Sequence, residues 1–473
     1  MSFQLSPDVD KNRIFLIQRS ALGERLDCEY YQPSHYHDLQ LLKASPYRND
    51  VLDHVCLRIV DGPFGSSIKS QDYVESGIPF FRVADVTRGK GSVKTDDLIY
   101  ITEEAHQKII RSRVVPGDVV IAKTGATMGA ASLVPANIPE ANIRGDLAAL
   151  SLNQNDCLPQ YIVIYINTNI GQRLFWRLDS GGTRGRVVIG NLKKYPIVIP
   201  PKEIQEKIIA RMDTAYAAKK QKEAEAQRLL DSIDDYLLSE LGINLLEPEE
   251  NTIQNRVFYR KLSEVSGGRF DPNNYQNERL EAINSLKNGI FPVKKLCEIV
   301  AFRSIKTNEI SEETVYVGME NITSNTGEIV TTNEKDSISS ASIFMKNDVL
   351  FPKLRPYLNK VYCAEEEGIC STEFHVLHSN SECNEFIANF LRSRVVVSQT
   401  KCLTSGNTLP RLQLEDINKF LIPIPPLEKQ IETVDRITTI RTQAKQLRQA
   451  AAAELEQAKQ EVEAMILGEG NKA

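Results

Sequence analysis

The sequence predicts an α+β protein made of two copies of one mixed α/β module, each closed by a long helix. Three observations predict it. First, residues 178–211 match residues 403–436 without a gap, with 13 identities in 34 positions. Second, each copy carries short β-type runs, such as residues 118–122 and 347–351, before a helix-like stretch. Third, each copy ends in a Pro–Pro pair that opens a segment free of proline and glycine.

The repeat extends over nearly the whole chain, with offsets that drift between matching segments. Residues 116–123 match 346–353, residues 80–87 match 316–323, residues 12–15 match 255–258, and residues 25–32 match 269–276. Drifting offsets indicate that loops were gained or lost between fixed elements. The period is far too long for a solenoid, so the sequence predicts a duplicated domain. The strongest match includes the pairs Ser180/Ser405, Gly181/Gly406, Thr183/Thr408, Arg186/Arg411, Pro200/Pro425, Pro201/Pro426, Glu203/Glu428 and Gln205/Gln430.

The chain of 473 residues is long enough to form several hydrophobic cores. The repeat divides it into six segments. We expect an N-terminal arm, a first body, a first helix, a second arm, a second body and a second helix. Their predicted bounds are residues 1–45, 46–201, 202–245, 246–290, 291–426 and 427–467, respectively.

The two long helices follow from the absence of proline and glycine between Pro201 and Gly242 and between Pro426 and Gly468. About 40 residues would span roughly 60 Å. Apolar or small residues spaced by three and four form a narrow seam on each helix, which predicts a helical partner. The seam runs from Ile204 to Leu241 on the first helix and from Leu427 through Ile431 to Met465 on the second. We expect the two helices to pack on each other as an antiparallel coiled coil, giving a pseudo-two-fold arrangement of the two bodies. The alternative is that each helix packs only on its own body.

Composition restricts the class of protein. No stretch reaches the roughly 20 apolar residues of a membrane helix, and the first residues lack the apolar run of a signal peptide. The eight cysteines contain no CxxC pair, which is typical of a reducing cytoplasm. The net charge of −5 excludes a uniformly basic surface, but a local basic stripe is enough to bind DNA. Six basic residues between Arg173 and Lys194 form one such run, which is also typical of a solvated face.

The duplicated order of motifs resembles the specificity subunit of type I restriction–modification complexes. The motifs read SGGTRGR…VIPPKEIQ in the first copy and SGNTLPR…IPIPPLEKQ in the second, each followed by a long helix. DGPFGSSIK at residues 61–69 also resembles the start of a recognition domain in that family, and the second copy has no clear counterpart. No single motif is specific, but their repeated order is.

The resemblance implies a non-catalytic DNA-recognition subunit. Each body would be a target recognition domain that reads half of a bipartite site in double-stranded DNA. The helices would form a spacer and a docking surface. Two modification subunits would bind S-adenosylmethionine and methylate adenine, so this chain would bind no cofactor, and a restriction subunit is a further potential partner. Two readers on a stiff spacer suit half-sites about 10 bp apart.

The predicted DNA contacts fall into two groups. The repeated loops come first, because glycine lets the backbone approach a phosphate and arginine can bind guanine or phosphate. Shared residues serve backbone contacts or the fold, whereas base readers should lie where the copies differ. The predicted base readers are Arg82, Arg88 and Lys90 in the first copy and Arg303, Lys306, Arg355 and Tyr357 in the second. The full set is Ser66, Lys69, Arg82, Arg88, Lys90, Lys123, Ser180, Gly181, Thr183, Arg184, Arg186, Arg303, Lys306, Lys353, Arg355, Tyr357, Ser405, Gly406, Thr408 and Arg411. A structural turn is the alternative for the Gly–Thr pairs.

Catalytic and metal sites are not predicted. Residues 271–275 read DPNNY rather than the D/N-P-P-Y/F of an amino-methyltransferase, and no glycine-rich loop suits a nucleotide. The Asp118…Lys123 spacing lacks the second acid of a nuclease core. Cys363, Cys370, His375, His378 and Cys383 lie close in sequence without the paired spacing of zinc sites, so no metal is expected.

Two other functions remain open on sequence alone. One is a coiled-coil scaffold whose bodies bind protein, and salt-dependent, sequence-selective DNA binding would distinguish it. The other is the DNA-targeting subunit of a defence complex that does not methylate. A neighbouring adenine methyltransferase gene would favour the modification complex over the second alternative.

Overall fold

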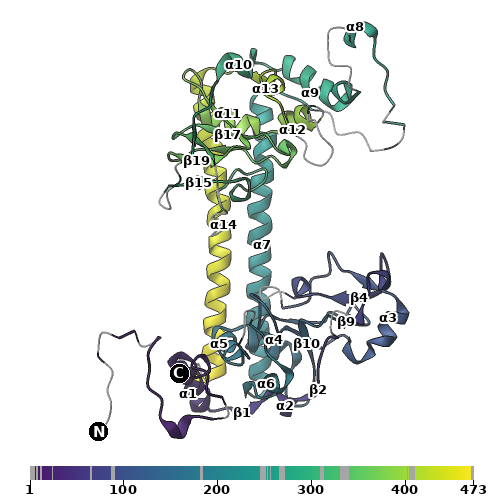
Figure 1. The fold of residues 1–473 in the computed structure, drawn as a ribbon, viewed down its shortest axis with the longest axis vertical. Helices are drawn as coiled ribbons and strands as arrows, with labels where there is room; N and C mark the ends of the chain where they lie inside the picture. Colours follow the sequence, from purple (N-terminus) through teal and green to yellow (C-terminus); the bar gives the residue numbers. More distant parts are fainter. Residues whose placement is uncertain are drawn as a thin grey trace. The chain divides into compact units, whose positions relative to one another are not determined.

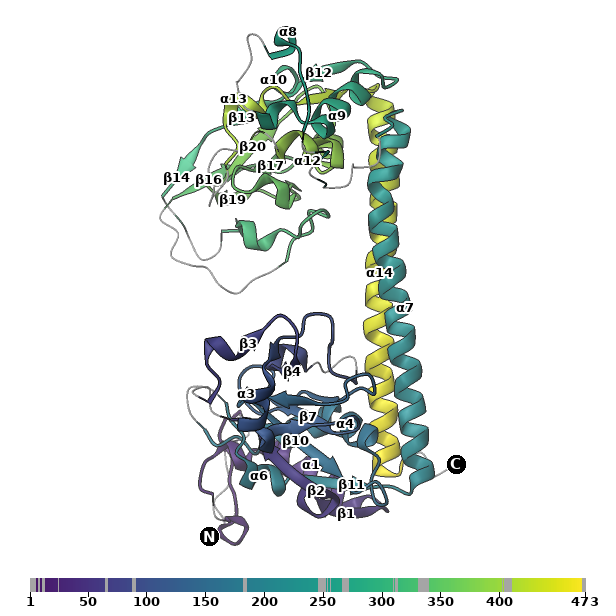
Figure 2. The ribbon, with the colours of Figure 1, turned by 90° about the vertical axis from the view of Figure 1, so that its right-hand side faces the viewer.

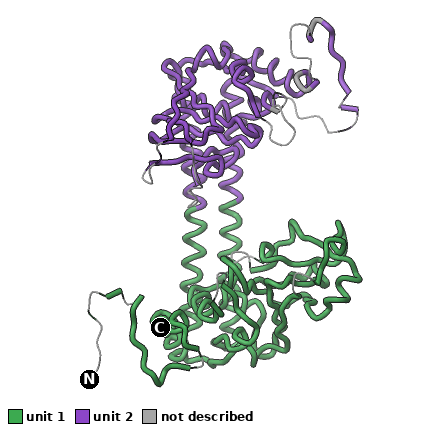
Figure 3. Tube along the Cα trace, viewed as in Figure 1, with its two compact units in different colours: residues 1–223, 449–473 green, residues 224–448 purple. Residues whose placement is uncertain are grey.

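The structure is a computed structural model of the chain. It describes residues 6, 9–10, 13–23, 25–63, 67–86, 91–181, 185–245, 252, 254–255, 257–265, 272–308, 310, 314–330, 340–401, 403 and 411–469. The chain forms two compact units (Figure 3). Unit 1 comprises Met1–Glu223 and Gln449–Ala473, and unit 2 comprises Ala224–Arg448. Both units combine sheets with helices, so the predicted α+β class is confirmed.

Unit 1 is built around an antiparallel sheet in the order β2-β10-β7-β8. A second sheet, in the order β3-β5-β4-β9-β6, contains a parallel pair that joins β4 to β9. Strands β1 and β11 form a third, two-stranded sheet. The strands are β1 (Arg48–Val51), β2 (Cys56–Asp61), β3 (Tyr73–Val74), β4 (Ile78–Phe81), β5 (Tyr100–Ile101), β6 (Arg113–Val114), β7 (Val119–Ala122), β8 (Ala131–Leu133), β9 (Ala141–Ile143), β10 (Leu147–Leu152) and β11 (Pro196–Ile199).

Unit 2 repeats this arrangement. Its central sheet has the order β13-β20-β17-β18, its second sheet has the order β14-β16-β19-β15 with a parallel pair that joins β15 to β19, and β12 pairs with β21. The strands are β12 (Val293–Lys295), β13 (Ala301–Arg303), β14 (Lys306–Thr307), β15 (Tyr316–Val317), β16 (Ala341–Phe344), β17 (Val349–Pro352), β18 (Tyr362–Cys363), β19 (Gly368–Ser371), β20 (Phe374–His378) and β21 (Leu421–Pro423). The internal repeat of the sequence is therefore a repeat of the central sheet and of the parallel pair, whereas the outer strands of the second sheet differ, with β3 and β5 in unit 1 and β14 in unit 2.

Each unit also contains short helices. In unit 1 they are α1 (Pro33–Ala44), α2 (Leu52–Val55), α3 (Glu103–Lys108), α4 (Pro159–Asn167), α5 (Asn169–Trp176) and α6 (Ile189–Lys193). In unit 2 they are α8 (Leu262–Val265), α9 (Asn277–Lys287), α10 (Leu296–Ile299), α11 (Asn384–Leu391), α12 (Arg394–Lys401) and α13 (Leu414–Ile417).

The single helix-like stretch predicted in each body is in fact two helices. In unit 1 the break falls at Thr168, whose extended backbone ends α4 and whose hydroxyl accepts a hydrogen bond from the Gly171 N–H at 3.0 Å. A threonine in this position caps the following helix, so the apolar run turns a corner instead of continuing. In unit 2 the equivalent break separates α11 from α12.

The predicted long helices are α7 (Lys202–Glu240) and α14 (Leu427–Leu467). In unit 1 the start of α7 packs against the end of α14, where Met212 and Val462 share one core with the sheet (Figure 2). Arg211 pairs with Glu461 at 2.5 Å, and Lys222 pairs with Glu454. Residue numbers increase along α7 in the direction in which they decrease along α14, so the two helices are antiparallel as predicted.

Unit 2 contains the other ends of the same two helices. Leu237 and Ile437 belong to its main core, and Lys429 Nζ lies 2.5 Å from the Glu240 carboxylate. The helices thus pack both on each other and on the bodies, which combines the two arrangements that the sequence left open. One part of the predicted seam is wrong, because Leu427 and Ile431 are 50% and 47% exposed. The buried position in that first turn belongs to Gln430.

Each body is also tied to the long helix of the other sequence repeat. In unit 1 the Ile170 N–H, at the start of α5, donates to Glu463 of α14 at 3.0 Å. In unit 2 the Arg394 N–H, at the start of α12, donates to Asp234 of α7 at 3.2 Å. A carboxylate at a helix N-terminus satisfies free N–H groups and stabilises the helix. The fold therefore uses both repeats to complete each unit.

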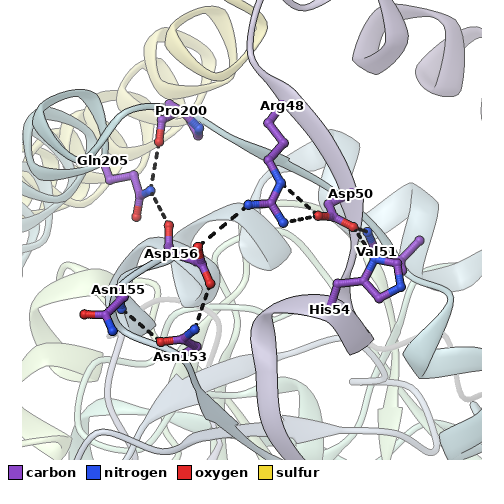
Figure 4. Close-up of polar contacts among 9 residues, drawn as sticks. All are labelled: Arg48, Asp50, Val51, His54, Asn153, Asn155, Asp156, Pro200 and Gln205. Atoms are coloured by element: carbon purple, nitrogen blue, oxygen red, sulfur yellow. Dashed lines mark hydrogen bonds and ion pairs between the residues drawn. The ribbon is translucent and has the colours of Figure 1, made fainter.

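The repeated glutamine of the E-x-Q motif has a structural role in both units. Gln205 and Gln430 are completely buried. Gln205 Nε2 donates to the Pro200 carbonyl at 2.9 Å (Figure 4), and its Oε1 accepts from the Leu158 N–H at 2.9 Å. Gln430 makes the same contacts to Pro425 and Cys383, also at 2.9 Å. The motif thus joins the start of each long helix to the start of the helix pair in the body.

Among the helices described here, none combines the length and the apolar character that a membrane span needs. The residues with described positions also contain no group of three or more His, Cys, Asp or Glu side chains that could hold a metal ion.

Candidate nucleic-acid interface

Several of the predicted contact residues lie at or beside one turn in each unit, which follows strand β17 (Figure 1) or β7 (Figure 2). In unit 1 the Lys123 N–H donates to the Asp146 carbonyl at 2.9 Å, and the Lys123 carbonyl accepts from the Val187 N–H at 2.9 Å. In unit 2, Lys353 makes the same two contacts, to Glu373 at 2.7 Å and Leu412 at 2.9 Å. Three segments therefore meet around one lysine in the same way in both units.

The backbone of this turn is repeated more closely than its sequence. Residues with positive φ occur at Gly117, Gly125 and Gly129 in unit 1 and at Asn347, Arg355 and Asn359 in unit 2, each pair 230 residues apart. Glycine adopts this conformation freely, whereas a left-handed residue with a side chain costs roughly 1–3 kcal/mol. Arg355 adopts this conformation with a φ of 47°. Unit 2 thus has an exposed arginine side chain at the position where unit 1 has Gly125, which has no side chain.

The repeated Ser–Gly loop of unit 1 lies beside this turn. The Asp179 carboxylate accepts hydrogen bonds from the N–H groups of Gly181 at 3.2 Å and Arg186 at 2.7 Å. The Ser180 N–H donates to the Arg186 carbonyl at 2.8 Å, which closes the base of the loop. Ser180, Gly181 and Arg186 are exposed at its edges. The alternative of a structural turn is therefore observed, and the same turn exposes Ser180, Gly181 and Arg186, whose contact with DNA stays a prediction.

The N-terminal arm supports this loop, which the sequence did not predict. Arg25 Nη2 donates to the Asp179 carbonyl at 2.5 Å. The Tyr30 ring has the Arg25 guanidinium 4.8 Å and the Arg177 guanidinium 3.6 Å from its centre. Burial lowers the pKa of Arg177, and its Nε donates to the Tyr30 carbonyl at 3.1 Å. The sequence nevertheless contained a sign that the arm is part of the fold, because residues 25–32 match residues 269–276 of the second copy.

Several predicted contacts are engaged within the protein. Lys123 is 2% exposed, with its Nζ 3.3 Å from Asp61. Arg82 pairs with Asp85 at 3.1 Å, which raises its pKa. Arg303 pairs at 2.8 Å with Asp348, which is completely buried and also lies 3.1 Å from His378 Nδ1. These side chains stabilise the fold, and their contact with DNA stays a prediction.

A cationic cluster gathers around Lys353 in unit 2. Its Nζ donates to the Thr372 carbonyl at 2.7 Å. Burial lowers the pKa of Lys353, the carboxylate of Glu373 raises it, and the charges of Lys306 and Arg411 lower it. Lys306, Arg355 and Tyr357 are exposed. The structure thus brings together residues that lie as far apart in sequence as Lys306 and Arg411.

The remaining predicted residues are placed as follows. Lys69 is exposed next to a short helical turn in unit 1. Eight predicted contacts lie outside the described residues: Ser66, Arg88, Lys90, Thr183, Arg184, Ser405, Gly406 and Thr408.

Unit 1 has a hollow of about 710 Å³ at the same turn. It is lined by Val83, Thr124, Gly125, Ala126, Asp146, Trp176, Gly185 and Arg186. Trp176 is the single tryptophan of the chain and is 39% exposed. Neither Asp146 nor Trp176 belongs to the predicted contacts. The hollow contains an acceptor, a donor and an aromatic side chain, which suits a polar planar ligand.

A comparison with known protein families explains why the arrangement of sheet, turn and long helix occurs twice in this chain. The family model described as the type I restriction modification DNA specificity domain matches residues 65–228 and 287–457. The chain belongs to this family. The two matches coincide with the two copies of the sheet, turn and helix arrangement, so each unit carries one domain of the family.

Individual relatives are more distant. The specificity subunit of the type I restriction enzyme EcoDI from Escherichia coli is 28% identical over 104 residues, which is 22% of this chain and 23% of that protein. The chain therefore matches about a quarter of the length of that curated relative.

Solved structures were also found. A chain from work on complex assembly and conformational transition of the type I R-M system has a TM-score of 0.46 and 15% identity, over 89% of this chain and 97% of that one. The HsdS subunit from Thermoanaerobacter tengcongensis has a TM-score of 0.37 and 14% identity, over 89% and 97%. The S subunit of a type I restriction-modification system from M. genitalium has a TM-score of 0.39 and 13% identity, over 89% and 96%.

Proposed function

We propose that this chain is the sequence-specific DNA-recognition subunit of a type I restriction–modification complex. The observation that carries the proposal is the presence of two DNA specificity domains of one family in one chain, each with the same turn. Two similar but non-identical readers suit a bipartite site whose halves differ in sequence. The turns carry exposed cations that differ between the units, with Arg186 in unit 1 and Lys306 and Arg355 in unit 2.

The division of labour follows from this assignment. Exposed arginine and lysine bind phosphates and base edges, and the first kind of contact makes affinity depend on salt. The chemistry of methylation belongs to partner subunits that bind S-adenosylmethionine, and this chain binds no cofactor. Two equivalent units call for two copies of the modification subunit, with a restriction subunit as a further partner. The complex acts on chromosomal DNA, so its place is the cytoplasm.

The test is to co-express the chain with the adenine methyltransferase encoded beside it and to map N6-methyladenine across the genome. A split motif that disappears when this chain is deleted is the expected result. Methylation that the deletion leaves unchanged would overturn the proposal. Sequence-selective DNA binding without any methylation would point to a defence complex with another effector. Binding without sequence preference or salt dependence would point to a protein scaffold.

A further inference from the structure

The same acid and arginine positions are used differently in the two units. In unit 2 Arg411 and Glu373 form a two-point ion pair, with Nη2–Oε1 at 2.6 Å and Nε–Oε2 at 3.2 Å. Their unit 1 counterparts are Arg186 and Asp146. The bridges from Arg186 to Thr124 and from Arg411 to Leu354 relate the two arginines, and the hydrogen bonds from the Lys123 and Lys353 N–H groups to the Asp146 and Glu373 carbonyls relate the two acids. Within the described ranges, the Arg186 guanidinium has no carboxylate at ion-pair distance, and Asp146 lies 4.0 Å from Arg144.

The length of the acid accounts for this difference. Glutamate is one methylene longer than aspartate, and both residues are held at the same point by the hydrogen bond from the turn lysine to their carbonyl groups. The longer side chain of Glu373 reaches across to Arg411, whereas Asp146 and Arg186 line one hollow without meeting. Arg186 therefore keeps its guanidinium donors and Asp146 keeps its acceptors for a ligand.

The chemistry of the hollow identifies the ligand within DNA. In the major groove a G·C pair presents the acceptors O6 and N7 of guanine beside the N4 amino donor of cytosine. Arginine binds the guanine edge with two hydrogen bonds, and aspartate accepts from the cytosine amino group. An A·T pair does not offer this combination, because the paired edge presents the adenine amino donor and the thymine O4 acceptor.

We propose that Arg186 and Asp146 read one G·C base pair of the half-site bound by unit 1, with Trp176 as the apolar wall of the reading site. This inference rests on the proposed function. In unit 2 the ion pair to Glu373 occupies Arg411, so the other half-site is read by other residues, among which Arg355 projects from the corresponding turn. Equivalent arginines of the repeat thus have different roles: Arg186 recognises DNA in unit 1, and Arg411 stabilises the structure of unit 2.

The first experiment determines the methylated motif with the wild-type complex and with single variants. Arg186→Lys removes the two-point contact and keeps the charge, and Asp146→Asn removes the acceptor for cytosine. Each variant is expected to relax one G·C position of one half-site and to lower affinity for the cognate duplex by about 5- to 150-fold. Asp146→Glu is expected to close the ion pair onto Arg186 and to have the same effect. Arg228→Lys, at an exposed position of α7, is the matched control and is expected to leave both half-sites unchanged.

The second experiment uses the full-length chain and its only tryptophan. A duplex that carries the mapped motif is expected to change Trp176 fluorescence, and a duplex with the G·C pair replaced by A·T is expected to change it less. Trp176→Phe verifies the source of the signal. Circular dichroism and thermal unfolding verify that each variant is folded.

The outcomes separate the two proposals. If the wild-type chain has no sequence-selective DNA binding, the proposed function fails. If the wild-type chain is selective but Arg186→Lys and Asp146→Asn retain the full motif and affinity, only the present inference is overturned. Relaxation at an A·T position, or in the half-site that also changes with Arg355→Ala, overturns it as well.

Discussion

The Arg177 guanidinium lies 3.6 Å from the centre of the Tyr30 ring, which links the N-terminal arm to the end of helix α5. Arg25 approaches the same ring at 4.8 Å and also binds the carbonyl of Asp179. Because Asp179 holds the base of the repeated loop, the arm fixes a surface that we propose contacts DNA. A segment that resembles a simple N-terminal extension in the sequence is therefore part of the reading unit.

Replacement of Tyr30 by leucine should loosen this loop and weaken DNA binding several-fold without unfolding unit 1. Cation–π contacts of this kind contribute about 0.5–2 kcal/mol. Tyr30→Phe keeps the ring and is the matched control, which should bind DNA like the wild type. Limited proteolysis and DNA titration measure the two effects. Equal affinity of Tyr30→Leu and wild type would show that the arm does not position the loop.

Loss of either buried glutamine should destabilise the unit that contains it. Gln205→Ala and Gln430→Ala each leave a backbone N–H and a proline carbonyl without their partners, which costs about 1–3 kcal/mol per buried group. Thermal unfolding of the full chain measures the change. Gln227→Ala, on the exposed side of the same helix α7, is the control and should have little effect. Variants as stable as this control would contradict the structural role.

The exposed Lys306 beside the unit 2 turn should account for part of the salt dependence of DNA binding. If Lys306 neutralises one phosphate, Lys306→Ala should reduce the slope of log K against log salt by about 1. Lys295→Ala, an exposed lysine on β12, is the charge-matched control. An unchanged slope for Lys306→Ala would place this phosphate contact elsewhere.

Unit 2 should lose stability in mild acid because of His375. Burial, together with the neighbouring positive charge of Lys353, lowers the pKa of His375 from 6.5 to about 4. The unfolded chain therefore binds a proton between pH 6.5 and pH 4 that the folded unit does not. Stability is complete above pH 6.5 and falls as the pH decreases through this window, by on the order of 1–2 kcal/mol between pH 7 and pH 5.

The matching measurement compares thermal unfolding of the wild type and of His375→Gln at pH 7.5, 6 and 5. The variant lacks this titrating group, so the difference between the two proteins should shrink or reverse as the pH falls. Parallel curves over the whole range would exclude His375 as a source of acid sensitivity.

The sequence determined the repeat, the α+β class and the two long antiparallel helices. These features depend on local periodicity, on prolines at helix starts and on identities that survive between the two copies. It also identified Arg186 and Arg411 as one position, since both lie in the repeated loop.

Only the tertiary structure determined what each copy of that position does. The partner of Arg411 is Glu373, 38 residues away, and its reach depends on one methylene that no pattern reveals. The same holds for Arg303, which the sequence predicted as a base reader and which pairs with the buried Asp348. Local sequence specifies which element forms, whereas the environment of a charged side chain is set by segments that meet only after folding.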